Sequence, residues 1–314
     1  MFGDKVSVIM PTYKRDRSFM ETALKSLLEQ SYENVEIIVV DDSPSDYEYR
    51  DEVGEYINSI EGHNIIYVKN EVNIGGALAR NEGIKRATGR YITFLDDDDK
   101  YLPDKILHQV EFMDKGNFDM SLSNMLIYNT NNELIDVRKH DQIGKLRNKE
   151  LLVYHLKRHL TGTPTFMYKA EKLREIGGFD DIKMGQEFIL MLKTIENRLR
   201  IGYMSETYDV VVLRHGESIS TSKNKISGER ELYERKKKYF NRFTLGDQMF
   251  IRMRHYAVLA VAYKRNGMYL PFLFYGIVAF LSSPLDVFKE IVRHFKNIKE
   301  QERELKRLKS EGFN

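Results

Sequence analysis

The chain has 314 residues, of which 42% are hydrophobic and 31% charged, and its formal net charge is +2. These values are typical of a globular protein with one large or two small domains, and they exclude a disordered or collagen-like chain. The sequence has no cysteine, which excludes disulfides, thiolate zinc sites and a cysteine nucleophile. The first apolar run, residues 6–10, is too short and too early for a signal peptide, so we expect a cytoplasmic protein.

Short apolar runs alternate with helical patterns over the first hundred residues. This alternation indicates an α/β fold with a mostly parallel central sheet flanked by helices. Ser18 with Glu21 and Ser45 with Glu48 have the spacing of capping boxes at two helix starts. The predicted strands are residues 6–10, 36–40, 64–68 and 91–95, and the predicted helices are 18–30, 47–60 and 75–87.

The second part of the chain has a less regular pattern. We expect it to extend the same sheet and to supply a second substrate site. Strands are predicted at residues 120–128, 134–137, 165–168, 201–204 and 209–214, and helices at 149–156 and 188–195. After residue 228 the pattern becomes helical and basic.

The C-terminal part differs in charge from the rest. Residues 230–265 contain 10 Lys or Arg against 3 Asp or Glu, and residues 266–285 contain no charge. A basic segment beside an apolar one favours an anionic partner, either a membrane or a nucleic acid, with a solvated helical tail as the alternative. Twenty uncharged residues could just span a bilayer, but Pro271, Gly276 and Pro284 argue against one straight helix. We therefore rank a membrane-surface or re-entrant anchor first, buried core helices second and a true span third.

Four consecutive carboxylates, Asp96, Asp97, Asp98 and Asp99, follow the predicted strand at 91–95. If the strand continued, Asp96 and Asp98 would face one side and Asp97 and Asp99 the other. Their mutual repulsion favours a bound divalent cation, Mg²⁺ or Mn²⁺, together with substrate phosphates. The alternative is an acidic turn that caps the next helix.

Polar residues follow the other strands as well, at the edge where open α/β sheets bind ligands. Asp41 and Asp42 end the second strand, and Pro11, Thr12 and Tyr13 follow the first. Arg80, in the segment NIGGALARNEG, could present paired donors to a diphosphate. That segment is not a GxGxxG fingerprint and no P-loop pattern occurs, which argues against a dinucleotide-binding Rossmann domain.

Taken together and in order, these motifs resemble those of the inverting family 2 glycosyltransferases, which have a GT-A fold. The resemblance covers about residues 5–240. It rests on VSVIMPTYKR, the pair Asp41 and Asp42, NIGGALARNEG, GRYITFLDDDD with LPD, and IGGFDD followed by GQEF.

The resemblance implies a role for several positions. Asp42 would contact the nucleotide base, in a pocket that Pro11, Thr12 and Tyr13 line, and Arg80 would lie near the nucleotide. Asp96 would contact the ribose and Asp98 the divalent ion, with Asp97 as a supporting carboxylate of the nucleotide-sugar site.

The general base of the family lies in a Glu-Asp pair after GGFD. Here Gln186 and Glu187 occupy these positions, so the role passes to Glu187. His215 is a further candidate metal ligand, as a histidine in this region is in some relatives. The segment TGTPT, residues 161–165, resembles the loop that shapes the sugar and acceptor site, and Phe188 is a candidate for stacking on a sugar, since the chain has no Trp.

The resemblance implies a metal-dependent inverting glycosyltransferase that uses a nucleotide-sugar, with a UDP-sugar as the favoured donor. The basic and apolar C-terminus favours a glycan or lipid-linked acceptor and a peripheral position on the cytoplasmic membrane face. We expect a catalytic domain at residues 1–240, with a nucleotide-binding half (1–100) and an acceptor half (101–240), and a helical region at 241–314. The alternatives are a sugar-phosphate nucleotidyltransferase, a catalytically silent nucleotide-binding scaffold and, for the segment RKKKYFNRF, a nucleic-acid-binding role, although we expect no nucleic-acid partner.

Overall fold

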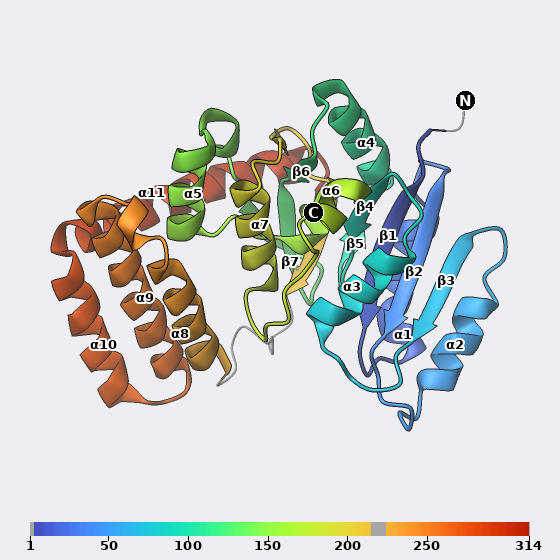
Figure 1. The fold of residues 1–314 in the computed structure, drawn as a ribbon, viewed down its shortest axis with the longest axis horizontal. Coiled ribbons are helices and arrows are strands. Elements are labelled where there is room, and N and C mark those ends of the chain that lie inside the picture. Colours follow the sequence, from blue (N-terminus) through green and yellow to red (C-terminus); the bar gives the residue numbers. More distant parts are fainter. Residues whose placement is uncertain (1–2, 215–223, 314) are drawn as a thin grey trace.

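The computed structural model describes residues 3–214 and 224–313. Strand and helix alternate in its first hundred residues, as predicted, and the four strands there pair in parallel because each helix returns the chain to the start of the sheet (Figure 1). These elements are β1 (Val6–Thr12), α1 (Arg17–Leu28), β2 (Val35–Asp41), α2 (Arg50–Asn58), β3 (Asn64–Lys69), α3 (Gly76–Arg86) and β4 (Tyr91–Phe94).

The following residues complete this sheet and build a second one. The seven-stranded sheet has the order β10-β6-β9-β4-β1-β2-β3, in which β9 runs antiparallel to both neighbours, and the four-stranded sheet has the order β5-β11-β7-β8. The strands are β5 (Lys100–Tyr101), β6 (Met120–Ser123), β7 (Met125–Asn129), β8 (Leu134–Arg138), β9 (Met167–Lys169), β10 (Ile201–Met204) and β11 (Val210–Arg214). The helices between them are α4 (Lys105–Gly116), α5 (Asn148–Arg158), α6 (Ala170–Glu175) and α7 (Gln186–Glu196), with short 3₁₀ turns at Ile143–Lys145 and Thr163–Thr165.

The prediction of one strand at residues 120–128 is wrong, because the chain changes sheet at Asn124. The Asn124 side chain is fully buried, donates from Nδ2 to the Ser205 carbonyl at 2.7 Å and accepts a hydrogen bond from the Tyr203 hydroxyl. These bonds hold the break between β6 and β7. The expectation that the second part extends the first sheet is therefore correct for β6, β9 and β10 and wrong for β7, β8 and β11.

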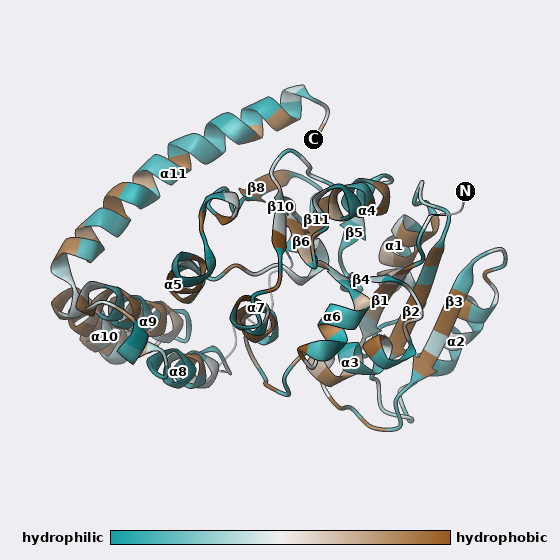
Figure 2. Ribbon diagram, turned by 45° about the horizontal axis from the view of Figure 1, so that its top comes forward, coloured by the Kyte–Doolittle hydropathy of each residue, from teal (hydrophilic) through white to brown (hydrophobic). Residues whose placement is uncertain are grey.

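Helices cover both faces of the main sheet. Along β1, Ile9 packs into a core with side chains of α3, α6 and α7, whereas Val8 and Met10 pack into a core with α1, α2 and α4. The strands are hydrophobic along most of their length because both faces are buried (Figure 2). The fold is thus a layered α/β sheet whose polar groups remain at the strand ends.

Both predicted capping boxes are wrong. Helix α1 is capped by Asp16, whose Oδ1 accepts from the Phe19 amide at 3.0 Å and from the Ser18 hydroxyl at 2.6 Å. Helix α2 begins at Arg50, five residues after Ser45, and its N-cap, Tyr49, has no side-chain bond. Asp16 is the stronger cap because its carboxylate accepts from both groups.

The C-terminal part is a group of helices beside the two sheets (Figure 1). Residues 266–285 form neither a straight span nor a fully buried pair of helices, since the chain bends by 106° at Ser283 between α10 and α11. Within residues 3–214 and 224–313, no single helix is long and apolar enough to cross a membrane. Helices α10 and α11 taken together would be, by length and composition alone. The elements are α8 (Asn224–Lys237), a 3₁₀ turn (Phe240–Arg242), α9 (Leu245–Arg265), α10 (Tyr269–Ser282) and α11 (Pro284–Ser310).

Helix α11 extends from the helical group to the second sheet (Figure 2). Near its start, the Arg158 guanidinium of α5 forms two hydrogen bonds with the Glu290 carboxylate. Near its end, Leu308 is fully buried in a cluster with Tyr208 and Leu134. The Glu304 carboxylate there accepts from Tyr208 and from Arg307, and these bonds, with one from Lys139, lower the pKa of Glu304 to about 2. The last turns of α11 are therefore fastened to β8 and its neighbours.

We expect Leu308→Ala to release the last turns of α11, because removing a buried leucine side chain costs about 2–5 kcal/mol. Hydrogen exchange of the amides of residues 299–313 measures this directly, and protection there should fall by at least tenfold. The matched control is Leu285→Ala on the same helix, where the side chain is 75% exposed and its loss should leave exchange unchanged. Equal protection in the two variants would contradict the role of Leu308.

Candidate active site

The carboxyl ends of β1, β2 and β4 meet at one edge of the main sheet, and the loops that follow them are tied together. The Asp42 amide donates to the Thr12 carbonyl at 2.9 Å, and the Lys14 amide donates to the Ser43 hydroxyl at 2.8 Å. The Thr12 hydroxyl donates to Asp97 Oδ2 at 2.8 Å. The structure therefore brings together the three polar segments that follow the strands.

The four carboxylates after β4 lie in a turn and not on a strand. Strand β4 ends at Phe94, and the Asp99 amide donates to the Asp96 carbonyl at 3.1 Å, which closes the turn. The extended backbone behind the predicted alternation is therefore wrong, but the predicted pairs recur in burial: Asp97 and Asp99 are buried, and Asp96 and Asp98 are more accessible. Each carboxylate instead turns to a different neighbour.

Asp97 and Asp99 are the buried members of this turn. Asp97 accepts from Thr12 and lies 3.3 Å from Arg15 Nε, and desolvation raises its pKa to about 6. Asp99 accepts from the Leu213 amide of β11 at 3.1 Å. Burial, followed by the charges of Asp96 and Asp98, raises the pKa of Asp99 well above its usual value. The turn therefore holds more negative charge than its neighbours offset.

Asp96 and Asp98 are the more accessible members. Asp96 forms an ion pair with the guanidinium of Arg80 on α3, and Asp98 Oδ2 lies 3.9 Å from Arg15 Nη2. Their side chains are 35% and 29% exposed. These two carboxylates are thus the ones that a ligand can reach.

Arg80 joins the carboxylate turn to helix α7. Its Nη2 donates to Asp96, and its Nη1 donates to Gln186 Oε1 at 3.1 Å. Its Nε atom is buried and has no hydrogen-bond partner among the residues that the structure describes. The bridge places the first residue of α7 beside the turn, although the two segments are about ninety residues apart.

Asp42 is the most heavily bonded side chain of the edge. Its carboxylate accepts from the Ile74 amide at 2.9 Å, the Gly75 amide at 2.7 Å, Asn70 Nδ2 at 2.9 Å and Asn73 Nδ2 at 3.0 Å. Four donors match the acceptor capacity of a carboxylate. Asp42 therefore fastens the loop between β3 and α3, and its predicted contact with a base stays a prediction.

The other residues predicted to bind the nucleotide lie at the end of β1 and directly after it. Pro11 is the last but one residue of β1, paired with Val40 of β2. Tyr13 follows that strand and is 45% exposed, which leaves its ring accessible to a ligand. Lys14, next to it, has a φ of 50°, so the chain turns sharply at this point. Pro11, Thr12 and Tyr13 thus border the carboxylate turn.

Glu187 lies in the first turn of α7, which begins after Gly185 with a φ of 78°. Its side chain is half-buried. Arg138, at the end of β8, lies within electrostatic range of it, and Glu187 opposes the lowering of the Arg138 pKa that partial desolvation causes. Glu187 and the carboxylate turn are connected through Gln186 and Arg80.

Two further predicted residues are not part of this edge. Phe188 is fully buried and stacks on His155 at 4.3 Å between ring centroids, so its predicted role as a sugar-stacking platform is wrong. The Phe188 side chain points into the core because successive residues of an α-helix project in different directions, so Phe188 and Glu187 lie on different faces of α7. His215 lies outside the residues that the structure describes.

The donor chemistry of the edge suits Mg²⁺ or Mn²⁺, which prefer carboxylate oxygens. Among the described residues, no three His, Asp or Glu side chains are arranged to hold one ion. Asp96 and Asp98 could supply oxygens, and their negative charges, which add to burial in raising the pKa of Asp99, favour a cation at this turn. The residues present therefore fit a divalent ion whose remaining ligands come from a substrate.

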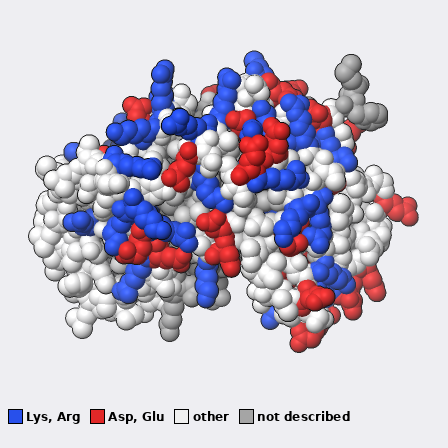
Figure 3. Space-filling model, viewed as in Figure 1, with Lys and Arg blue, Asp and Glu red and all other residues white. Residues whose placement is uncertain are grey.

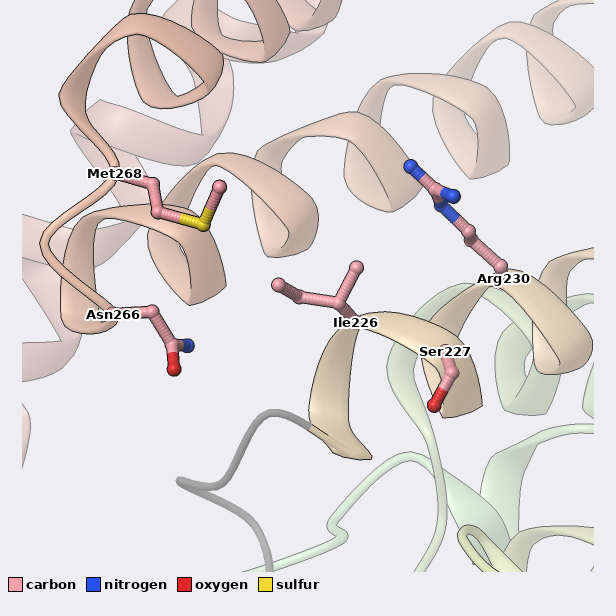
Figure 4. A pocket seen from close by; sticks show the side chains of 5 residues that line it. All are labelled: Ile226, Ser227, Arg230, Asn266 and Met268. Atoms are coloured by element: carbon pink, nitrogen blue, oxygen red, sulfur yellow. The ribbon is translucent and has the colours of Figure 1, made fainter.

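A pocket of about 590 Å³ lies elsewhere, between α8 and the connection from α9 to α10 (Figure 4). Ile226, Ser227, Arg230, Asn266 and Met268 line it. Arg230 donates to the hydroxyls of Tyr263 at 3.0 Å and Tyr275 at 3.1 Å. No residue of the strand ends lines this pocket.

Sequence reasoning missed two cations of the edge. Arg15 pairs with Asp97 and Asp98, and its position four residues after Pro11 in PTYKR was the available signal. No sequence motif indicated Arg138, because only the second sheet brings it within electrostatic range of Glu187.

Comparison with known proteins gives a consistent result. The model of the family described as "Glycosyl transferase family 2" matches residues 7–177. The putative colanic acid biosynthesis glycosyl transferase WcaA of Escherichia coli K12 is 27% identical over 274 residues, covering 83% of this chain and 94% of WcaA. WfaP of Escherichia coli, a UDP-Glc:alpha-D-GlcNAc-diphosphoundecaprenol beta-1,3-glucosyltransferase, is 40% identical over 122 residues, covering 39% of this chain and 46% of WfaP.

Solved structures show the same fold. S. aureus TarS 1-349, in complex with UDP-GlcNAc, aligns with a TM-score of 0.58 at 18% identity over 87% of this chain and 90% of that one. The mannosyltransferase PcManGT from Pyrobaculum calidifontis, in complex with GDP-Man and Mn²⁺, aligns with a TM-score of 0.58 at 16% identity over 91% of this chain and 83% of that one. The predicted GT-A fold is thereby confirmed.

We expect Asp42→Asn to lower the free energy of unfolding by about 2 kcal/mol or more, because an amide NH₂ would face donors that now have an acceptor. Urea unfolding measures the change, and Asp46→Asn in the same loop is the control, since Asp46 is exposed. Unchanged stability with altered nucleotide selectivity would instead assign Asp42 to base contact.

Proposed function

Because the chain belongs to glycosyl transferase family 2 and is a glycosyltransferase, we propose that it moves a sugar from a UDP-sugar to a hydroxyl of a cell-surface or lipid-linked glycan, with inversion and with a divalent ion. The observation that carries this proposal is the connection from the four-carboxylate turn through Arg80 and Gln186 to Glu187. It supports the proposal because a nucleotide diphosphate bound at the turn would then lie at the same edge of the sheet as the start of α7, where Glu187 is the candidate general base.

The donor site is proposed at the ends of β1, β2 and β4. Tyr13 is exposed and able to cover a base, and Asp96 is accessible to a ribose. Arg80 has a buried Nε without a partner among the described residues and a guanidinium that already spans two segments. UDP is favoured because WfaP is named as a UDP-Glc-dependent glucosyltransferase and TarS binds UDP-GlcNAc, although PcManGT binds GDP-Man.

Asp98 is the proposed ligand of Mg²⁺ or Mn²⁺, supported by Asp96, and Asp97 supports the nucleotide-sugar site through Arg15 and Thr12. His215 remains a proposed further ligand. When bound, the ion would neutralise charge on the leaving diphosphate. The Mn²⁺ in the PcManGT complex supports the choice of metal.

Glu187 is the proposed general base. In a single displacement, the acceptor hydroxyl oxygen forms a bond to the anomeric carbon while the bond from that carbon to the diphosphate oxygen breaks. The hydroxyl proton passes to the Glu187 carboxylate, and the configuration inverts. Arg138 limits the negative charge around Glu187 before the proton arrives.

The acceptor is proposed to be at the cytoplasmic face of a membrane. Helix α10 lies at one end of the molecule, where few charged side chains appear (Figure 3). Apolar side chains at least half exposed on α10 and α11 define what we call the C-terminal apolar face: Tyr269, Leu270, Leu273, Phe274, Ile277, Phe280, Leu281, Leu285, Phe288, Ile291, Val292 and Phe295. Such an area exceeds what isolated surface residues produce and marks a binding surface.

The proposed division of the chain follows from these assignments. Residues 1–240 would form the catalytic domain, with nucleotide-binding and acceptor halves at 1–100 and 101–240, and residues 241–314 the membrane-associating region. Contacts join the two parts, since Tyr233 of α8 stacks on His255 of α9 at 4.0 Å between ring centroids.

We expect Glu187→Gln to reduce the turnover number by about 10²-fold or more while UDP affinity stays within twofold, because the amide cannot accept the proton. Sugar transfer and calorimetric UDP binding are measured on the same preparations. Glu196→Gln is the control, since Glu196 is exposed at the other end of α7. Full turnover in Glu187→Gln would assign the base elsewhere.

We expect UDP to bind more tightly with Mn²⁺ than with EDTA, and Asp98→Asn to remove most of that difference because one anionic ligand is lost. Titration calorimetry with UDP, GDP and dTDP measures both metal dependence and selectivity. Asp104→Asn, an exposed carboxylate before α4, should behave as the unmodified protein. Equally tight UDP binding with Mn²⁺ and with EDTA would contradict metal dependence.

A further inference from the structure

A second pocket, of about 370 Å³, lies between α8, α9 and α11. One stripe of α9 forms its wall, with spacings of three and four residues that place the side chains on a single helical face. Arg254 and Arg265 stand at the two ends of this stripe, and Ala257, Val258, Val261 and Ala262 lie between them. Lys225 of α8 and Glu290 of α11 complete the lining. The pocket thus combines an apolar wall with cations.

Its cations lack carboxylate partners. Lys225, Arg254 and Arg265 form no hydrogen bond or ion pair with any residue in the described ranges. Glu290, the acid of the pocket, is already held by two hydrogen bonds from Arg158. The positive charge of the pocket is therefore available to a ligand.

Arg254 belongs to a cluster of three arginines and two glutamates, in which positive charge is in excess. Arg158 and Arg293 act on it from neighbouring helices, against the carboxylates of Glu290 and Glu229. Glu229 is buried and lies 3.1 Å from His255 Nδ1. Lys225 and Arg254 both disfavour the charge of buried Lys236, whose pKa burial lowers to about 8. An anion beside Arg254 would offset this excess.

The pocket adjoins the C-terminal apolar face on one side, and on the other its cations lie within electrostatic range of buried Lys236. Lys236 Nζ is 2.7 Å from His159 Nε2 and 5.2 Å from the centroid of the Phe188 ring. On the side of the apolar face, Glu290 stands on α11 between exposed Phe288 and Ile291. A ligand with an anionic head group and an apolar chain therefore matches the cations of the pocket and the apolar side chains beside it.

We propose that this pocket binds the phosphate group of a lipid, with the phosphate at Arg254 and Lys225 and the chain along Val258 and Val261. The proposal rests on the proposed function, in which the acceptor is lipid-linked, and it assigns the recognition of the lipid phosphate to α8 and α9. The phosphate can come from the diphosphate of an isoprenoid carrier or from the head group of a membrane phospholipid. A nucleic acid fits less well, because its phosphates are not attached to an apolar chain that the wall would cover.

The test is titration calorimetry of the full chain with farnesyl diphosphate, in EDTA and saturating UDP so that the donor site is not measured. We expect Arg254→Gln and Lys225→Gln each to weaken binding by about tenfold or more, because each removes a charge-assisted contact with the phosphate. Arg252→Gln is the matched control, an exposed arginine of the same helix, and should bind as the unmodified protein does. Lys225 is on a different helix and is only half-buried, so its variant tests the site even if Arg254→Gln is unstable.

Further ligands distinguish an isoprenoid diphosphate from a phospholipid head group as the source of the phosphate. Inorganic pyrophosphate and farnesol report the head and the chain alone, and both should bind more weakly than farnesyl diphosphate. Vesicles of phosphatidylglycerol, compared with phosphatidylcholine, report phospholipid head groups. Vesicle binding that falls in Arg254→Gln without any farnesyl diphosphate binding would support the site with a phospholipid as its ligand.

Equal affinity for farnesol and farnesyl diphosphate, or identical binding by Arg254→Gln and Arg252→Gln in both assays, would overturn the proposal. Failure of the pocket is distinguishable from failure of the proposed function. Transfer to a lipid-linked acceptor with an unchanged KM in Arg254→Gln would overturn only the pocket, whereas phosphate-dependent binding in a chain without transferase activity would overturn only the function.

Discussion

Electrostatic repulsion among the carboxylates after β4 is the constraint on which the rest of the edge depends. Four negative charges in one turn are tolerated only if each is paired, hydrogen-bonded or protonated. The turn meets this demand with partners from separate elements: Arg80 of α3 for Asp96, Arg15 for Asp97 and Asp98, and β11 for Asp99. The same contacts that lower the repulsion thereby bring α3, the end of β1 and the second sheet to one place.

Much of the first hundred residues could be predicted from the sequence, because continuous apolar runs leave few alternatives to a doubly covered parallel sheet. The meeting of the polar segments after β1, β2 and β4 could also be predicted, because the carboxyl ends of parallel strands lie at the same edge of the sheet. The pairing of Asp96 with Asp98 was predicted, but the turn that holds them was not, because it depends on a backbone hydrogen bond from Asp99 to Asp96. Asp16 similarly displaced Ser18 as a helix cap through a local bond that spacing alone does not reveal.

The remaining failures have tertiary causes. The break at Asn124 is held by Tyr203 and Ser205, about eighty residues later in the chain, so no local pattern indicates it. Phe188 is adjacent to Glu187 but stacks on His155 from another helix, which removes it from any sugar. The unpaired cations of α9 likewise emerge only when the rotation of the helix and its neighbours are known. Charge composition indicated an anionic partner without showing where it would bind.

Helix α11 joins two parts that the sequence gives no reason to connect. Its 27 residues make a rod of roughly 40 Å. One end belongs to the C-terminal apolar face, and the other is fastened to β8, whose last residue, Arg138, lies within electrostatic range of Glu187. Because both ends are anchored, the helix would fix the distance between the candidate site and any surface on which its first turns lie. Under the proposed function, an acceptor too short or too long to bridge that distance would be excluded, whatever its sugar.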